Sequence, residues 1–191
     1  MFVRLVRPAI SLLVIMTVLL GLVYPLAITG LARVSFPRQA EGSLIHKDGK
    51  LIGSRLIGQS FSDPKYFWGR PSATTPQPYN GLGSSGSNLG PLNPALLDQV
   101  KANAKALHDA DPQNQQPIPV ELVTASASGL DPEISPAGAR YQAARVGRAR
   151  SIPLAQVEAL IAAHEQGRLL GLISERRINV LELNLALDRL R

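Results

Sequence analysis

The pattern of hydrophobic and polar residues is most distinctive near the N-terminus, where apolar side chains surround a whole helix. Pro8 to Ala32 is a run of 25 residues without a charged side chain. As an α-helix it would be about 37 Å long, at ~1.5 Å per residue, and would exceed the ~30 Å of hydrocarbon in a bilayer. The run therefore predicts a membrane-spanning helix, with Gly21 and Pro25 as positions for a kink.

Two other interpretations of this run stay open. A cleaved signal peptide would end at a small-x-small site, for which Gly30-Leu31-Ala32 qualifies. A buried core helix could also be uniformly apolar. We favour a retained anchor, because the uncharged run is longer than the roughly 7 to 15 apolar residues of a signal peptide.

Beyond the anchor, short apolar runs alternate with turn residues. Residues 43–58 hold two such runs around Asp48-Gly49, a dipeptide typical of tight hairpin turns. Residues 71–97 then lack any charge and are dense in glycine, proline, serine and asparagine, which indicates either disorder or an ordered functional loop. Residues 120–124 are β-type in composition, and residues 126–135 are typical of turns.

Helical patterns fill the second half of the chain. Helix starts are expected at Asn93-Pro94, Ser135-Pro136 and Ser151 with Pro153, and Asn179 to Glu182 has capping-box spacing. The apolar positions of these helices recur at spacings of three and four: Leu97, Val100, Ala104 and Leu107; Leu154, Val157 and Ile161; Val180, Leu183, Leu187 and Leu190. We therefore predict an anchor at 1–38 and one mixed α+β domain at 39–191, with a β-hairpin, short strands and about four helices.

The distribution of charge along the chain supports a membrane anchor and argues against a nucleic-acid partner. Lysine and arginine number 20 against 14 acids, but residues 1–38 contain four arginines and no acid, so the remainder carries 16 basic against 14 acidic groups. A nearly neutral domain lacks the basic surface that nucleic acid requires. The short basic tail favours an N-terminus in the cytoplasm and an external soluble domain, although basic residues flank both ends of the span.

Catalytic and metal-binding patterns are weak. The chain has no cysteine, and its three histidines are not spaced as metal ligands. The serines around Ser84 to Ser87 lack the strand and helix of a nucleophile elbow. Asp131 and Glu133 lie in a turn, where carboxylates more often bind backbone amides. We therefore expect no catalytic residue, no metal and no cofactor of the chain's own.

Partner contacts are the better candidates. Three consecutive aromatics and a nearby arginine fit a core or interface plug better than a base-stacking platform. A stretch without acids, 134–157, contains four arginines, of which Arg145 and Arg148 would be neighbours while Arg140 points elsewhere. They could pair with partner carboxylates or lipid phosphates, or form a solvated face. The candidate contacts are Tyr66, Phe67, Trp68, Arg70, Ser84, Ser87, Asn88, Arg145 and Arg148.

Four longer strings add a family resemblance. YFWGRPSA (66–73), SSGSNLGPLNP (84–94), PVELVTASASGLDPEISPAGARYQAARVGRAR (119–150) and INVLELNLALD (178–188), behind one N-terminal span, closely resemble the C-subunit family of the Kdp-type potassium-transporting P-type ATPases. The resemblance covers essentially the whole chain. Glu133 and Gly138 depart from the family's usual residues, and these departures put no role in doubt.

The resemblance implies a non-catalytic subunit of a bacterial inner-membrane pump, required for assembly and activity. Its partners would be a potassium-channel-like pore subunit, an ATP-hydrolysing subunit, a small peptide subunit and membrane lipid. ATP and potassium would be handled by the complex. The family's C subunit has also been described as a catalytic chaperone that raises the ATP affinity of the hydrolytic subunit, which an external domain could do only indirectly.

Two other functions stay open as alternatives to the accessory subunit. One is a membrane-tethered hydrolase that uses Ser84, Ser85 or Ser87. The other is direct nucleotide binding by residues 129–150, for which no phosphate loop is present, since no lysine lies between Lys65 and Lys101.

Overall fold

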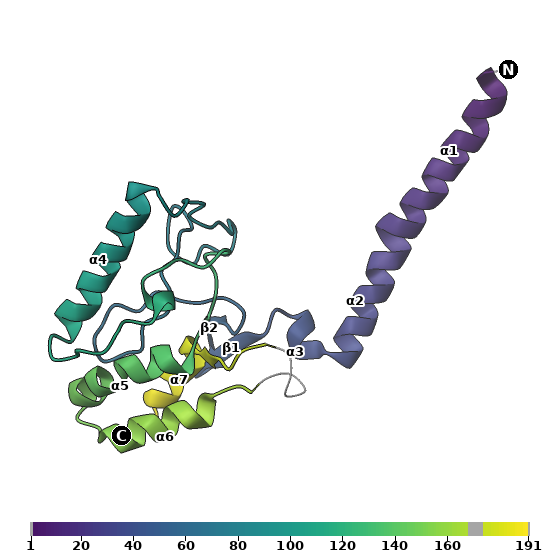
Figure 1. Cartoon of the computed structure of the whole chain (residues 1–191). Helices are drawn as coiled ribbons and strands as arrows, with labels where there is room; N and C mark the ends of the chain where they lie inside the picture. The colour runs from purple at the N-terminus through teal and green to yellow at the C-terminus, as the bar shows by residue number, and fades with distance from the viewer. Residues whose placement is uncertain (1, 168–173, 191) are drawn as a thin grey trace. The chain divides into compact units, whose positions relative to one another are not determined.

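The computed structural model describes residues 2–167 and 174–190. The chain divides into two compact units, Met1–Ile52 and Gly53–Arg191. The first unit opens with a continuous helical stretch that comprises α1 (Phe2–Val18), the π-helical turn η1 (Leu19–Val23) and α2 (Tyr24–Ser35), before the short helix α3 (Pro37–Ala40) (Figure 1). The sequence predicts a domain boundary after residue 38. Contacts in the structure give a boundary after Ile52, so the first strand of the hairpin belongs to the same unit as the long helix.

Pro25 explains why the long helix contains a π-helical turn. Proline has no N–H for the carbonyl of Gly21, and its ring crowds that carbonyl. The N–H of Tyr24 bonds to the carbonyl of Leu19, five residues back, which is the wider spacing of a π-turn. The irregularity expected at Gly21 and Pro25 thus takes the form of a π-turn within a continuous helix.

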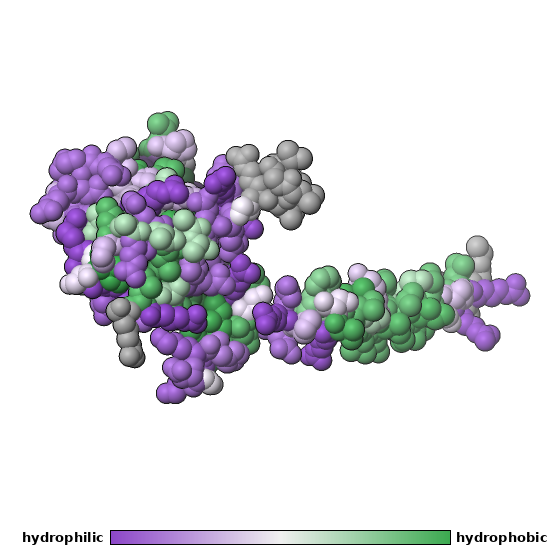
Figure 2. All heavy atoms as spheres, turned by 90° about the horizontal axis from the view of Figure 1, so that it is seen from below, coloured by the Kyte–Doolittle hydropathy of each residue, from purple (hydrophilic) through white to green (hydrophobic). Residues whose placement is uncertain are grey.

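The helix from Arg4 to Ser35 is the one helix among the described residues that is long and apolar enough to cross a membrane, with a mean hydropathy of 2.4 over an 18-residue stretch. None of its apolar stretch is buried. Figure 2 shows hydrophobic side chains along its length and hydrophilic ones at both ends. The interpretation as a buried core helix is therefore wrong, whereas a retained anchor and a signal sequence both fit these properties.

The hairpin forms where the sequence predicts it. Strands β1 (Leu44–Lys47) and β2 (Lys50–Ser54) pair with each other. Asp48 and Gly49 join them with φ angles of 53° and 76°. Two central residues with positive φ are typical of a type I′ turn, whose twist matches that of the strands.

The second unit is a mixed α+β domain, as expected. After β2 and a long irregular segment, its elements are α4 (Pro94–Ala110), the 3₁₀ turn η2 (Val120–Leu122), β3 (Glu133–Ile134), α5 (Pro136–Arg150), α6 (Leu154–His164), β4 (Ile178–Asn179) and α7 (Val180–Leu187). Helix α6 packs on both α5 and α7 (Figure 1). Strands β3 and β4 form a short antiparallel pair in which Ile134 lies opposite Ile178.

Capping side chains start three of these helices at the predicted residues. Asn93, Ser135 and Asn179 each accept a hydrogen bond from a backbone N–H in the first turn. The helical interpretation of the leucine-rich segment 180–187 is confirmed. Buried residues of the helices, of the β3–β4 pair and of the irregular segments form one cluster: Phe67, Leu107, Leu122, Val123, Ile134, Ala139, Tyr141, Ala143, Val146, Val157, Ile161, Ile178, Val180, Leu183 and Leu187.

Two local predictions are wrong. Residues 120–124 do not form a strand: η2 occupies the segment, and Thr124 bonds back to the carbonyl of Val120 through both its N–H and its hydroxyl. Ser151 does not start a helix. It ends α5 in a left-handed conformation (φ 57°), donating its N–H to that helix's last turn, and α6 begins only at Leu154.

Candidate partner-binding surface

The aromatic segment 66–68 runs through the middle of the second unit, and Phe67 is its most buried residue. The Phe67 side chain is 0% exposed. The side-chain amide of Asn184 in α7 accepts from the N–H of Phe67 and donates to its carbonyl, both at 2.9 Å. Asn184 thus supplies the two backbone hydrogen bonds that a neighbouring strand would supply in a β-sheet. We therefore assign Phe67 to the core and not to a partner contact.

Trp68 is held in the same way by Gln142 of α5. The Gln142 amide accepts from the N–H of Trp68 at 2.8 Å and donates to its carbonyl at 3.0 Å. The guanidinium of Arg145 lies 4.5 Å from the Trp68 ring centre and donates to Gln142 at 2.7 Å. Arg145 also donates to the carbonyl of Pro64.

Arg145 is a structural residue. It is only 4% exposed, and this burial lowers the pKa of its guanidinium to about 10. The stacking on Trp68 and the two acceptors compensate for the lost hydration. We therefore assign Arg145 to this internal network and not to a partner contact.

Tyr66 joins the end of α5 to the end of α7. Its hydroxyl donates to Asp188 at 3.4 Å, and the guanidinium of Arg150 lies 4.8 Å from its ring centre. Arg150 also pairs with Asp188 at 2.7 Å. Tyr66 is partly buried, so only one side of this contact could face a partner.

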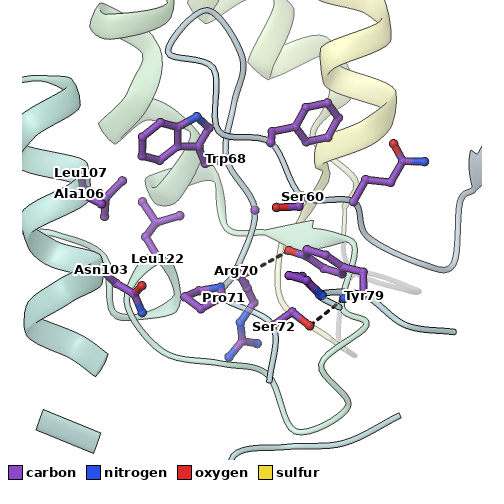
Figure 3. A pocket seen from close by; sticks show the side chains of 14 residues that line it. Ser60, Trp68, Arg70, Pro71, Ser72, Tyr79, Asn103, Ala106, Leu107 and Leu122 are labelled. Carbon is purple, nitrogen blue, oxygen red and sulfur yellow. Dashed lines mark hydrogen bonds between the residues drawn. The ribbon is translucent and has the colours of Figure 1, made fainter. Parts of the chain in front are cut away.

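Arg70 and Tyr79 fix the start of the uncharged segment 71–97. Arg70 pairs with Asp131 at 3.0 Å, and its carbonyl accepts from the hydroxyl of Tyr79. Burial, assisted by the negative charge of Asp131, raises the pKa of Tyr79 to about 12. The Ser72 hydroxyl accepts from the Tyr79 N–H at 2.9 Å, so the chain folds back on itself here (Figure 3).

Farther along segment 71–97, residues 84–86 lie against residues 127–129. The N–H of Ser85 and the hydroxyl of Ser84 donate to the carbonyl of Ser128, at 2.9 and 3.0 Å. Gly129 has a φ of +66°, and a Cβ there would lie 2.5 Å from the carbonyl oxygen of Ser85. This close backbone contact requires glycine. The segment is therefore an ordered loop, one of the two alternatives that the sequence left open.

The outer part of this loop is open to solvent. Asn88 is exposed, with a φ of 53°. Leu82 and Leu92 are 100% and 95% exposed. Contiguous exposed apolar patches mark interaction sites, whereas single exposed leucines are common on protein surfaces. Asn88 and Ser84 remain partner-contact candidates, next to leucines that the sequence analysis did not select.

Two cavities of about 270 and 290 Å³ adjoin one another beside α4. Trp68, Tyr79, Leu107 and Leu122 line the first (Figure 3), and Ser87 lines the second. Asn103 lies at both and donates to the carbonyl of Val123 at 3.1 Å. Among the described residues that line either cavity, only Arg70 is charged, and it is paired with Asp131. These lining residues thus include no free cation of the kind that a nucleotide's phosphates would need.

The remaining arginines of α5 lie at the surface. Arg148 donates to Asp111, and Arg140 pairs with Glu165 at 3.4 Å. Both arginines line one cavity. The expectation that Arg145 and Arg148 are neighbours while Arg140 points elsewhere is therefore wrong: Arg145 is buried against Trp68, whereas the loop after α4 packs over both Arg140 and Arg148.

Other chemistry is sparse within residues 2–167 and 174–190. No group of three or more His, Asp or Glu side chains there could hold a metal ion. The hydroxyls of Ser84 and Ser85 donate to backbone carbonyls, and His164 contacts the carbonyl of Leu160. These serine contacts are structural, and none of the contacts found in the described part of the chain joins them to a histidine.

Sequence reasoning missed the two amides that hold the aromatic segment. Asn184 and Gln142 are 2% and 1% exposed. Each is a polar residue among apolar helix positions, and that pattern alone could have marked them as buried hydrogen-bonding groups.

Comparison with known proteins adds a family match over nearly the whole chain. The family model described as K+-transporting ATPase, c chain, matches residues 6–189. A relative from Dechloromonas aromatica (strain RCB) named Potassium-transporting ATPase KdpC subunit is 62% identical over 184 residues, covering 96% of each chain. Relatives with the same name from Variovorax paradoxus (strain S110) and Sorangium cellulosum (strain So ce56) are 62% and 59% identical, covering 96% and 97% of this chain and 95% and 97% of their own.

Proposed function

Because the chain belongs to the family of the K+-transporting ATPase c chain, we propose that it is a non-catalytic accessory subunit of an ATP-driven potassium import complex, needed for its assembly and stability. The family match, which spans both the apolar helix and the mixed domain, carries this proposal. The internal use of the buried polar groups supports it, since Asn184, Gln142 and Arg145 hold the fold together.

The proposed topology is a single pass through the bacterial inner membrane. The exposed apolar helix from Arg4 to Ser35 needs lipid or a membrane-embedded partner around it. The short tail with Arg4 and Arg7 would stay in the cytoplasm, and the domain that begins after the span would lie outside.

The proposed division of work leaves potassium and ATP to other subunits. A potassium filter needs rings of carbonyls from a pore protein, which one span cannot build. The acceptor motif of P-type ATPases is Asp-Lys-Thr-Gly, whereas the nearest string here, Asp48-Gly49-Lys50-Leu51, comprises the hairpin turn and the start of β2. The partners would be a channel-like pore subunit, an ATP-hydrolysing subunit and a small peptide subunit. Any increase in ATP affinity would be transmitted through them as a coupling free energy.

Removal of residues 1–38 tests the proposal directly. We expect the truncated chain to be lost from the affinity-purified pump and potassium uptake to fall. As a control, a chain in which an unrelated single span replaces residues 1–38 shows whether attachment to the membrane alone is sufficient. Full assembly and uptake without any anchor would contradict the proposal.

A reporter fused after Arg191 tests the topology separately. An external domain predicts activity from a periplasmic reporter such as alkaline phosphatase and none from a cytoplasmic one. The reverse result would favour direct nucleotide contact by residues 129–150 instead.

A further inference from the structure

A third cavity, of about 370 Å³, lies where the loop after α4 folds over α5. It shares no lining residue with the two cavities beside α4, and seven of its nine lining residues are polar or charged: Asp111, Gln113, Asn114, Gln115, Gln116, Arg140, Tyr141, Ala144 and Arg148. Two arginines face one acidic residue in this lining. The cavity therefore presents two guanidinium groups, each paired with one carboxylate.

Both arginines hold their charge at the surface. The Arg148 and Arg140 side chains are 51% and 56% exposed, whereas the Asp111 side chain is 5% exposed. Asp111 accepts from one guanidinium nitrogen of Arg148, so other N–H groups of that fork are able to donate to a second acceptor.

Arg140 is held loosely. It pairs with Glu165 at 3.4 Å, and Arg176 pairs with the same carboxylate at 2.7 Å. Glu165 would therefore keep a cationic partner if Arg140 turned toward another anion. A change of partner by Arg140 leaves no buried charge unpaired, which keeps its free-energy cost low.

The loop that closes the cavity is fixed in place. The Asn114 amide donates to the carbonyl of Tyr141 at 2.8 Å, and its oxygen accepts from the N–H of Gln116 at 3.1 Å. Gln113, Gln115 and Gln116 are exposed at its surface. The cavity thus combines two guanidinium groups with amides that are able to bind a peptide backbone.

We propose that this cavity binds an acidic segment of another protein of the complex, with carboxylates paired to Arg140 and Arg148. This inference rests on the proposed function, since it assumes that the chain has a protein partner. The two arginines lie eight residues apart on α5, which separates their Cα atoms by about 12 Å along the helix. That spacing favours a segment with two acids over a single small anion.

Carbodiimide cross-linking of the whole complex tests this proposal. Carbodiimide joins an amine to a carboxylate but leaves arginine unmodified, so R140K/R148K converts both positions into reporters and keeps their charge. R189K is the matched control, because Arg189 is an exposed arginine that does not line the cavity. We expect cross-links from positions 140 and 148 to an acidic residue of another subunit, at least about fivefold more abundant than from position 189.

A neutral variant gives an independent readout. R140Q/R148Q should weaken the association of the chain with the complex by about tenfold at moderate salt, and R189Q should not. Cross-links confined to Asp111 and Glu165 of the same chain, with unchanged association of R140Q/R148Q, would overturn the proposal while leaving the accessory function standing. Weaker binding of R140Q/R148Q to phosphatidylglycerol vesicles, without cross-links to protein, would overturn it in favour of a lipid surface. Failure of the unsubstituted chain to copurify would refute the accessory function itself.

Discussion

Replacing Asn184 by alanine tests whether two side-chain amides organise the domain. Asn184 satisfies the N–H and the carbonyl of Phe67, a residue with no exposed surface. Each buried group left without a partner costs about 1–3 kcal/mol, so the two together cost about 2–6 kcal/mol. Alanine's better helix propensity in α7 returns about 0.5 kcal/mol. We expect a net loss of about 2–5 kcal/mol, a large share of the stability of an ordinary domain.

The assay is denaturant unfolding of the full chain in detergent, followed by the fluorescence of Trp68, the only tryptophan. Q115A is the control for loss of an exposed amide. N184L, which keeps the number and branching of the side-chain heavy atoms but removes both hydrogen bonds, separates hydrogen bonding from packing. A loss below about 1 kcal/mol in N184A at unchanged m-value, or recovery of stability in N184L, would refute the role of the amide.

Three further results are expected. G129A should lose more thermal stability than G42A, because both glycines have positive φ but only the Cβ at Gly129 would meet a carbonyl, at 2.5 Å; equal losses would contradict the close packing. Burial raises the pKa of Tyr79 from the ordinary 10.0 of a tyrosine to about 12 in the folded protein, so its stabilising contribution is complete below pH 10 and is lost as the pH rises toward 12. Y79F should be about 1 kcal/mol less stable than the unsubstituted chain at pH 8, because it lacks the hydrogen bond, and should match that chain near pH 11. Denaturant titrations at the two pH values measure this difference, and a difference that does not change with pH would show that the phenol is not buried as described. Deletion of residues 1–38 should abolish copurification with the pump, measured by affinity purification and potassium uptake.

Local signals account for the parts of the fold that were predicted correctly. The hairpin needed only Asp48 and Gly49, whose positive φ angles define the turn. The caps at Asn93, Ser135 and Asn179 act within their own first turns. Such interactions span two or three residues, so the sequence displays them directly.

The errors arose where distant segments decide local structure. Strands β3 and β4 have two residues each and exist because Ile134 and Ile178 pair across 44 positions. Residues 120–124 have β-type composition, yet the segment turns so that Leu122 and Val123 enter the core. β-Propensity reflects a fit to neighbouring strands, and no strand lies beside this segment among the described residues.

For the candidate surface, residue type alone could not separate contact from core. Of four arginines on one helix, Arg145 is buried against Trp68, Arg150 is paired with Asp188, and Arg140 and Arg148 line a polar cavity. Helical spacing places residues on a face, but only the packing of other segments determines whether that face meets protein or water.

The order of residues along the chain was sufficient for the long apolar helix, the hairpin, the starts of three helices and the family, because each depends on nearby residues or on long strings read in order. The folded structure was needed to show that Phe67 and Arg145 are internal, that segment 71–97 is ordered, and that Arg140 and Arg148 share a cavity. The physical reason is that burial and hydrogen-bond pairing belong to contacts between residues far apart in the chain, such as Phe67 with Asn184, which no local pattern specifies.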